Sequence, residues 1–217
     1  MHLEKHLDYI APISCNKCPR LTAFLDKSRQ DNPNWYNAPV PSFGTIDAEI
    51  LVLGLAPGLR GANRTGRPFT GDFAGNTLYK TLSSHGFASG IYDPNGADTL
   101  SLINIRISNA VRCVPPKNKP ISSEINNCRF FLSTELKRMR RLKVILCLGR
   151  IAHDTLIRHF KLPPKNHLFN HCKSHLIKSD LLLLNSYHCS RYNMNTGRLT
   201  QEMFEDVFIK LKRLIRN

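Results

Sequence analysis

Four short apolar runs, separated by stretches with helical periodicity, constrain the fold of this chain most strongly. Each run is nearly continuous rather than alternating, and they occupy Ile50–Leu55, Leu100–Ile105, Val144–Leu148 and Leu181–Leu184. Continuous apolar runs of this length are typical of strands buried on both faces, as in a parallel sheet. Strands that alternate with helices favour an α/β fold, here a three-layer α/β/α sandwich around a parallel sheet.

The segments between these runs carry apolar side chains at helical spacing. A helix capped by Ser122 would place five apolar side chains on one face: Ile125, Cys128, Leu132, Leu136 and Met139. Further helices are expected from about Arg150, from about Thr200 and over 73–84. The Pro-rich region Pro33–Phe43 is expected to be a loop between a short N-terminal helix and the first strand.

Three segments rich in polar, Gly and Pro residues follow strand ends. They are Ala56–Asp72, Ser108–Pro120 and Ser186–Arg198. Ligands of open α/β sheets bind beyond the carboxyl ends of the strands, so these segments are predicted to converge on one cleft. A length of 217 residues suits one domain, 1–217, able to bury a sizeable core.

The charge balance points to a polyanionic partner. The chain has 31 Lys and Arg against 16 Asp and Glu, a formal net charge of +15. Nucleic acid is the first candidate, and the alternatives are a solvated basic surface or attraction to an acidic membrane. No apolar run approaches the roughly 20 residues of a membrane span, and the N-terminus lacks the apolar core of a secretory signal. We therefore expect a cytoplasmic protein with reduced thiols.

Four of the seven cysteines could form one metal site. Cys15 and Cys18 form a C-x2-C pair, Cys113 follows a strand, and Cys128 lies on the apolar face of the next helix. Four thiolates suit either zinc or an iron–sulfur cluster, and the spacing leaves that choice open. The alternative is that Cys113 and Cys128 are ordinary buried thiols. We leave three cysteines out of the site: Cys147, Cys172 and Cys189.

The Gly-rich segment GLAPGLRGANRTGRPFTGDFAG follows the first strand. It lacks the spacing of a phosphate-binding P-loop, but its glycines allow close approach of the backbone to a ligand. Arg64 and Arg67 within it suit phosphate contacts. The candidate substrate-binding residues at its start are Gly54, Ala56, Pro57 and Gly58.

Four further side chains each have a functional and a structural interpretation. Phe69 could stack on a flat base or anchor the loop, and the isolated carboxylate of Asp72 could act chemically or cap the helix over 73–84. Asn109 could pair with a base edge or form a turn. His188 could donate a hydrogen bond to a carbonyl oxygen on which charge develops, or be structural.

The motifs GLAPG, GRPFTGD, NAVRCVPPKNKP and SYH…NTGRLT, in this order, resemble those of family 5 of the uracil-DNA glycosylases. The match runs from CNKCPRL at Cys15 to GRLT at Thr200. The resemblance implies a four-stranded parallel sheet and hydrolysis of the N-glycosidic bond of uracil in DNA, with hypoxanthine or other deaminated bases as further substrates. Family 4 has Glu after the first Gly of GLAPG, where this chain has Leu55.

The resemblance also assigns roles. Asp72 corresponds to the acid that activates water, Phe69 to the residue that stacks on the flipped base, Asn109 to the residue that recognises it, and His188 to the group beside its O2. The cysteines would hold a structural 4Fe–4S cluster that ties the N-terminal segment 1–45 to the loop that follows the second strand: Cys15, Cys18, Cys113 and Cys128. One departure is Cys189, where the family usually has Pro.

These assignments describe a monomeric, monofunctional enzyme that flips a damaged base out of double- or single-stranded DNA. No Lys in the motifs is placed to form a Schiff base, so no strand-cleaving activity is expected. Association with the nucleoid would follow from DNA binding, for which the candidate phosphate contacts are Arg64, Arg67, Arg191 and Arg198. The rival is a zinc-bound nucleic-acid-binding module without activity, against which Asp72 and the converging loops count.

Overall fold

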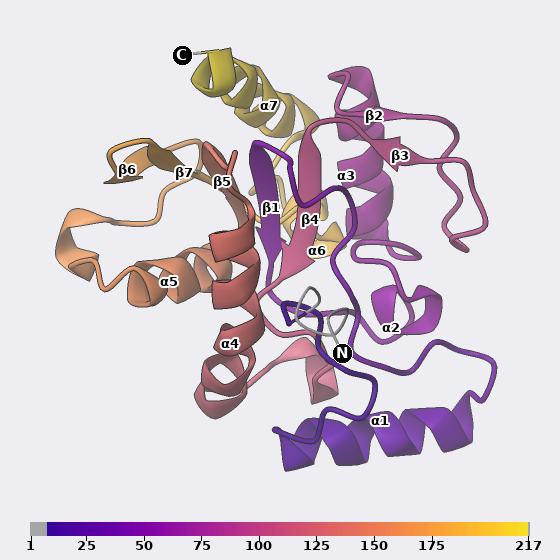
Figure 1. Ribbon diagram of the computed structural model, residues 1–217. Coiled ribbons are helices and arrows are strands. Elements are labelled where there is room, and N and C mark those ends of the chain that lie inside the picture. Colours follow the sequence, from indigo (N-terminus) through magenta and orange to yellow (C-terminus); the bar gives the residue numbers. More distant parts are fainter. Residues whose placement is uncertain (1–7, 217) are drawn as a thin grey trace.

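A five-stranded sheet lies at the centre of the molecule (Figure 1). The structure is a computed structural model that describes residues 8–216. The strand order is β4-β1-β5-β7-β6, and four neighbours are parallel: β4 (Ile105–Asn109), β1 (Ile50–Gly54), β5 (Val144–Leu148) and β7 (Leu181–Ser186). Helices cover both faces, which confirms the predicted α/β/α sandwich.

The sheet differs from the sequence prediction by one additional strand. β6 (Ser174–Lys178) pairs antiparallel with β7 at the edge, so the sheet is mixed rather than four-stranded and parallel. Its side chains alternate between the core and solvent, with Ile177 buried and Leu176 exposed. Because its side chains alternate in burial, this edge strand lacks the continuous apolar run that predicted the other strands.

The prediction that the second apolar run, Leu100–Ile105, forms a strand of the central sheet is wrong for most of the run. Only Ile105, its last residue, belongs to the sheet, and β3 (Ser101–Leu102) instead pairs with β2 (Ala88–Ser89) in a separate two-stranded ribbon. Asn104 separates the two parts because its φ of +55° lies in the left-handed region, which interrupts an extended strand. β4 continues through buried polar residues that the apolar pattern did not reveal.

Alternate residues of β1 enter different layers of the core. Ile50 and Val52 pack with α3 (Phe73–Ser84) and α7 (Gln201–Arg216), whereas Leu51 and Leu53 pack with α4 (Ser122–Arg138) and α5 (Arg150–His159). A third cluster joins α1 (Pro19–Asp31) to the segment after β4 and to α4. The shorter helices are α2 (Ala62–Thr65), η2 (Pro116–Asn118), η3 (Pro164–Asn166) and α6 (Arg191–Asn195).

The starts of α3, α4, α5 and α7 agree with the sequence prediction to within one residue. Asp72 is the N-cap of α3, whereas Ile121 rather than Ser122 occupies the N-cap position of α4. There the Glu124 carboxylate accepts a hydrogen bond from the Ile121 backbone N–H at 2.8 Å. Within residues 8–216, no helix has the length and apolar character needed to cross a membrane.

A buried carboxylate joins β4 to α4. Glu135 is fully buried and forms ion pairs with Arg106 and Arg112, both at 2.6 Å. Burial alone would raise the pKa of Glu135, but the two guanidinium groups outweigh it and lower the pKa to about 2. The Glu135 carboxylate thus gives a nearby counter-charge to two arginines that are otherwise shielded from water.

Glu135→Ala is expected to lower the free energy of unfolding by about 3–5 kcal/mol, because it leaves two buried guanidinium groups without a counter-charge. Urea denaturation at pH 7 measures this loss. The stabilisation by Glu135 is present above the ordinary glutamate pKa and is lost as the pH falls toward about 2. Asp26→Ala, which removes the exposed pair between Asp26 and Arg29, is the control, with an expected loss below about 1 kcal/mol. Equal losses in the two variants would contradict the assigned role.

Candidate functional site

One pocket lies at the carboxyl ends of the parallel strands, where the three predicted loops converge. Its volume is about 120 Å³. The loop after β1, the end of β4 and the loop after β7 all contribute, which confirms the predicted convergence. The lining residues are Ala56, Pro57, Gly58, Ala62, Phe69, Asp72, Ala74, Asn109 and His188.

Gly54 lies behind the pocket wall rather than in its lining. It is the last residue of β1 and pairs in register with Asn109, the last residue of β4. A Cβ atom at position 54 would collide with Asn109 Oδ1 and lie 2.7 Å from Cζ of Phe69. The absence of a side chain at Gly54 therefore allows these two side chains to meet over the end of the strand.

Asp72 both caps a helix and lines the pocket. Its Oδ1 caps α3 by accepting a hydrogen bond from the Gly75 backbone N–H at 2.8 Å. Its Oδ2 faces Gly58 and Gly61 and accepts no hydrogen bond from any residue in the described range. One carboxylate oxygen is thus structural, and the other is available to a ligand or a water molecule in the pocket.

The ring of Phe69 forms an apolar wall that stacks against His188. The ring centroids are 5.9 Å apart with an interplanar angle of 26°. Burial lowers the pKa of His188, and the nearby Asp72 charge partly offsets this effect. The imidazole is therefore neutral at pH 7, and its ring nitrogens have no hydrogen-bond partner among residues 8–216.

The amide of Asn109 borders the pocket and has no hydrogen-bond partner among residues 8–216. The residue is 3% exposed, and no residue of the described chain forms a hydrogen bond with its side chain. Because an amide offers both donors and an acceptor, this side chain can form hydrogen bonds with a polar ligand in the pocket. Asn109, His188 and Asp72 Oδ2 together offer both hydrogen-bond donors and acceptors to such a ligand.

The four arginines proposed as phosphate contacts do not share one environment. Arg191 and Arg198 are exposed near the pocket, over the rings of Phe73 and Tyr187, at 5.5 and 4.9 Å from the ring centroids. Arg64 is half-buried and donates hydrogen bonds to residues 60, 94 and 95.

Arg67 is turned inward and forms an ion pair with Asp98 at 2.5 Å, where the two side chains are 13% and 2% exposed. Its position therefore favours a structural role over the phosphate contact that the sequence suggested. Sequence reasoning also passed over Tyr192, which follows Arg191 and is 72% exposed. An aromatic side chain this exposed in the loop after His188 is a signal that only the structure provides.

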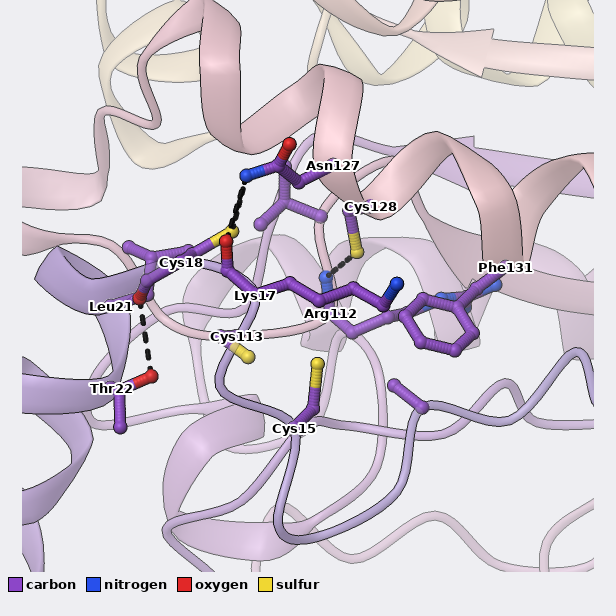
Figure 2. A pocket seen from close by; sticks show the side chains of 12 residues that line it. Cys15, Lys17, Cys18, Leu21, Thr22, Arg112, Cys113, Asn127, Cys128 and Phe131 are labelled. Carbon is purple, nitrogen blue, oxygen red and sulfur yellow. Dashed lines mark hydrogen bonds between the residues drawn. The ribbon is translucent and has the colours of Figure 1, made fainter.

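The four predicted cysteine ligands surround a second pocket (Figure 2). Cys15 and Cys18 precede α1, Cys113 follows β4, and Cys128 lies in α4. Burial and the proximity of the other thiols raise the pKa of Cys113 to about 12. Within residues 8–216, no group of His, Cys, Asp and Glu is placed to hold a single metal ion.

Two hydrogen bonds are directed at sulfur atoms of this pocket. The backbone N–H of Arg112 donates to Cys128 Sγ at 3.2 Å, and the Asn127 amide donates to Cys18 Sγ at 3.7 Å. Such donors stabilise thiolate ligands. The remaining cysteines line neither pocket, as expected: Cys147, Cys172 and Cys189.

Comparison with known proteins identifies the family. Residues 41–212 match the model of the uracil DNA glycosylase superfamily. The type-5 uracil-DNA glycosylase of Thermus thermophilus is 43% identical over 207 residues, which cover 93% of this chain and 94% of the relative. The chain belongs to the uracil-DNA glycosylase superfamily.

Further relatives support the type-5 group within this superfamily. The type-5 enzyme of Pyrobaculum aerophilum is 34% identical over 90% of this chain and 86% of its own length. The type-4 enzyme of Archaeoglobus fulgidus is 32% identical over 69% of this chain and 62% of its own length. The resemblance to family 5 is thus confirmed, and family 4 is the more distant group.

Proposed function

We propose that this protein is a monofunctional DNA glycosylase that hydrolyses the N-glycosidic bond of uracil in DNA. The observation that carries the proposal is one pocket, in a member of this superfamily, that combines an unpartnered amide, a neutral imidazole, a free carboxylate oxygen and an aromatic wall. These are the groups of Asn109, His188, Asp72 and Phe69. A single chain carries all of them, so we expect a monomer to be active.

Base recognition would use the aromatic wall and the amide. The target nucleotide must leave the duplex before the bond to its sugar becomes accessible. Phe69 then stacks on the flipped base, and the Asn109 amide pairs with its polar edge in both directions, since an amide is both donor and acceptor. Purines such as hypoxanthine also present a polar edge, which makes deaminated purines a second substrate class of the proposal.

Bond cleavage would divide the charge between Asp72 and His188. As the glycosidic bond breaks, positive charge develops on the sugar and negative charge on the leaving base. The free Oδ2 of Asp72 stabilises the sugar cation and orients a water molecule, whose oxygen bonds to the sugar and whose proton passes to the carboxylate. The neutral His188 donates its N–H to the oxygen of the departing base anion.

The exposed basic side chains around the pocket would hold the DNA. Arg191 and Arg198 are exposed, and Arg64 has part of its surface available for phosphate contacts. The exposed Tyr192, which directly follows Arg191 in the sequence, would occupy the space that the flipped base vacates, as apolar wedges do in other DNA-binding proteins. The excess of basic residues and the proposed DNA substrate support an association with cytoplasmic DNA.

The second pocket is the proposed site of a 4Fe–4S cluster. Four cysteines around one hollow, two of them receiving hydrogen bonds, fit the four thiolates that such a cluster requires. A single zinc ion would bind all four sulfur atoms at about 2.3 Å, so the four thiols would have to converge on one point. In a 4Fe–4S cluster each thiolate binds a different iron atom, so the four sulfur atoms lie farther apart. When bound, it would cross-link the segment before α1 to the segment that follows β4 and to α4. The proposed cluster-binding N-terminal segment is 1–45, and its first seven residues lie outside the described range.

Asp72→Asn tests the catalytic assignment. Asn caps a helix about as well as Asp, so α3 should keep its N-cap while the negative charge is lost. We expect uracil release from oligonucleotides, revealed by alkali at the abasic site, to slow by about 100- to 10,000-fold. Wild-type protein assayed on single- and double-stranded substrates with uracil, hypoxanthine or xanthine defines the substrate range. Asp26→Asn on the surface is the control, and near-wild-type release by Asp72→Asn would contradict the role.

Cys113→Ser tests the cluster. Wild-type protein purified without oxygen is expected to be brown, to absorb near about 400 nm and to contain about four irons per chain. Cys113→Ser should lose both the colour and the iron, because one of four ligands is gone. Cys172→Ser, a half-buried cysteine outside the pocket, is the matched control and should keep both. A colourless wild-type protein with one zinc ion per chain would contradict the assignment.

A further inference from the structure

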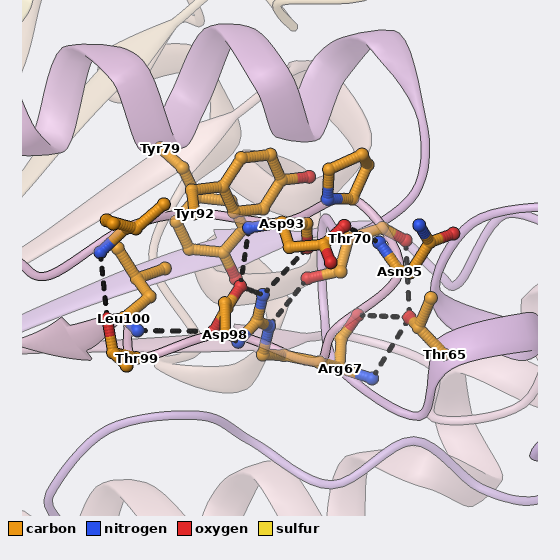
Figure 3. A network of polar contacts seen from close by, with 12 residues as sticks. Thr65, Arg67, Thr70, Tyr79, Tyr92, Asp93, Asn95, Asp98, Thr99 and Leu100 are labelled. Carbon is orange, nitrogen blue, oxygen red and sulfur yellow. Dashed lines mark hydrogen bonds and ion pairs between the residues drawn. The ribbon is translucent and has the colours of Figure 1, made fainter.

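Arg67 lies at the centre of a buried cage next to the pocket (Figure 3). Its guanidinium donates two hydrogen bonds to the carboxylate of Asp98, at 2.7 and 2.5 Å. Three aromatic rings surround the same group, with centroids between 5.1 and 5.8 Å from it, namely those of Phe43, Tyr79 and Tyr92. Arg67 lowers the pKa of Asp98 to about 2, so the pair stays charged at neutral pH.

The cage binds the pocket loop at three positions around Phe69. Arg67 Nε donates to the hydroxyl of Thr70 at 2.8 Å. The hydroxyl of Tyr79 donates to the carbonyl of Pro68 at 2.6 Å, and the hydroxyl of Tyr92 accepts from the Gly71 backbone N–H at 3.4 Å. The residues immediately before and after Phe69 are therefore both fixed by groups that contact the guanidinium.

Phe69 needs such external support because of its backbone conformation. Its φ of +53° lies in the left-handed region, which costs a residue with a bulky side chain of the order of 1–2 kcal/mol. Such a conformation persists only where the surroundings determine it. It is this conformation that places the ring in the pocket and against His188.

We propose that the Arg67–Asp98 ion pair is a positioning device, which holds Phe69 in its left-handed conformation and thereby sets the geometry of the flipped base relative to Asp72. This inference rests on the proposed glycosylase function. It gives the segment 91–99, which supplies Tyr92 and Asp98, a part in base removal although none of its residues lines the pocket. It also gives Arg67 a role different from that of the arginines proposed to bind phosphates.

The test is a comparison of Arg67→Lys and Asp98→Asn. Lysine cannot reproduce the two-pronged contact of arginine, and asparagine removes the counter-charge. We expect each variant to cleave uracil-containing duplex about 100-fold more slowly in single turnover, the scale of a misplacement of about 1 Å. Affinity for the same duplex should stay within about twofold of wild type, with the same salt dependence. Hydrogen exchange of the amides of residues 66–71 should become faster.

Arg106→Lys is the matched control, since Arg106 is also an arginine in a buried ion pair but does not line the pocket. It should change stability without changing exchange in 66–71. Tyr92→Phe loses only the hydroxyl that accepts a hydrogen bond from the Gly71 N–H. It should slow cleavage and speed the exchange of residues 66–71 by a few-fold. This variant keeps the proposal testable if Arg67→Lys and Asp98→Asn unfold.

Two results would overturn the proposal. Weaker DNA binding in Arg67→Lys, with unchanged binding in Asp98→Asn, would show that Arg67 itself makes a two-pronged contact with a phosphate. Unchanged cleavage and unchanged exchange in both variants would show that the ion pair has only a stabilising role. If the wild-type protein releases no uracil, the proposed function fails, and the exchange of 66–71 still decides whether the ion pair positions the loop.

Discussion

The close approach of β1, β4 and the Gly-rich loop at Gly54 is the constraint on which the pocket depends. The parallel register brings the ends of the two strands together, and the missing side chain lets Phe69 and Asn109 meet above them. A larger residue at position 54 would have to displace either the aromatic wall or the amide. Packing of the sheet and the chemistry of the site are therefore set by the same contact.

The pairing of buried charges shows how Asp72 differs from the other buried carboxylates of this strongly basic chain. The buried carboxylates of Asp98, Glu124 and Glu135 are each paired with arginine. Each of these carboxylates therefore has a cationic partner that favours its charged form. Asp72 differs from them, because its Oδ2 faces the pocket without a cationic partner among the described residues. Oδ2 is consequently free to interact with a ligand in the pocket.

Sequence reasoning succeeded where a residue's local pattern determines its place. The continuous apolar runs at 50–55, 144–148 and 181–184 are strands, because burial on both faces leaves a signature in hydrophobicity alone. The polar loops after them converge for a topological reason that any parallel sheet shares. β6 was missed because an edge strand is only half-buried, and the start of β4 was misplaced because buried Arg106 and Ser108 interrupt its apolar run.

The candidate site shows a similar division. Asn109 and His188 lie at or just after strand ends, and Phe69 and Asp72 lie in the Gly-rich loop. Their convergence on one pocket could therefore be predicted from strand order and motif. The role of Arg67 could not, since its partner Asp98 is 31 residues away and belongs to a segment with no recognisable motif. Tyr192 likewise has no signature until its exposure is known.

The two interpretations of Asp72 that the sequence held apart turn out to depend on each other. A carboxylate that only lined the pocket could rotate about its side-chain bonds and present either oxygen. The hydrogen bond from the Gly75 N–H engages Oδ1, and this limits rotation and directs Oδ2 toward Gly58 and Gly61. The N-cap of α3 is thus also what orients the acid of the site, and the cage around Arg67 fixes the loop that leads into that cap. Capping of α3 and the orientation of the pocket carboxylate are therefore coupled through the Asp72 side chain.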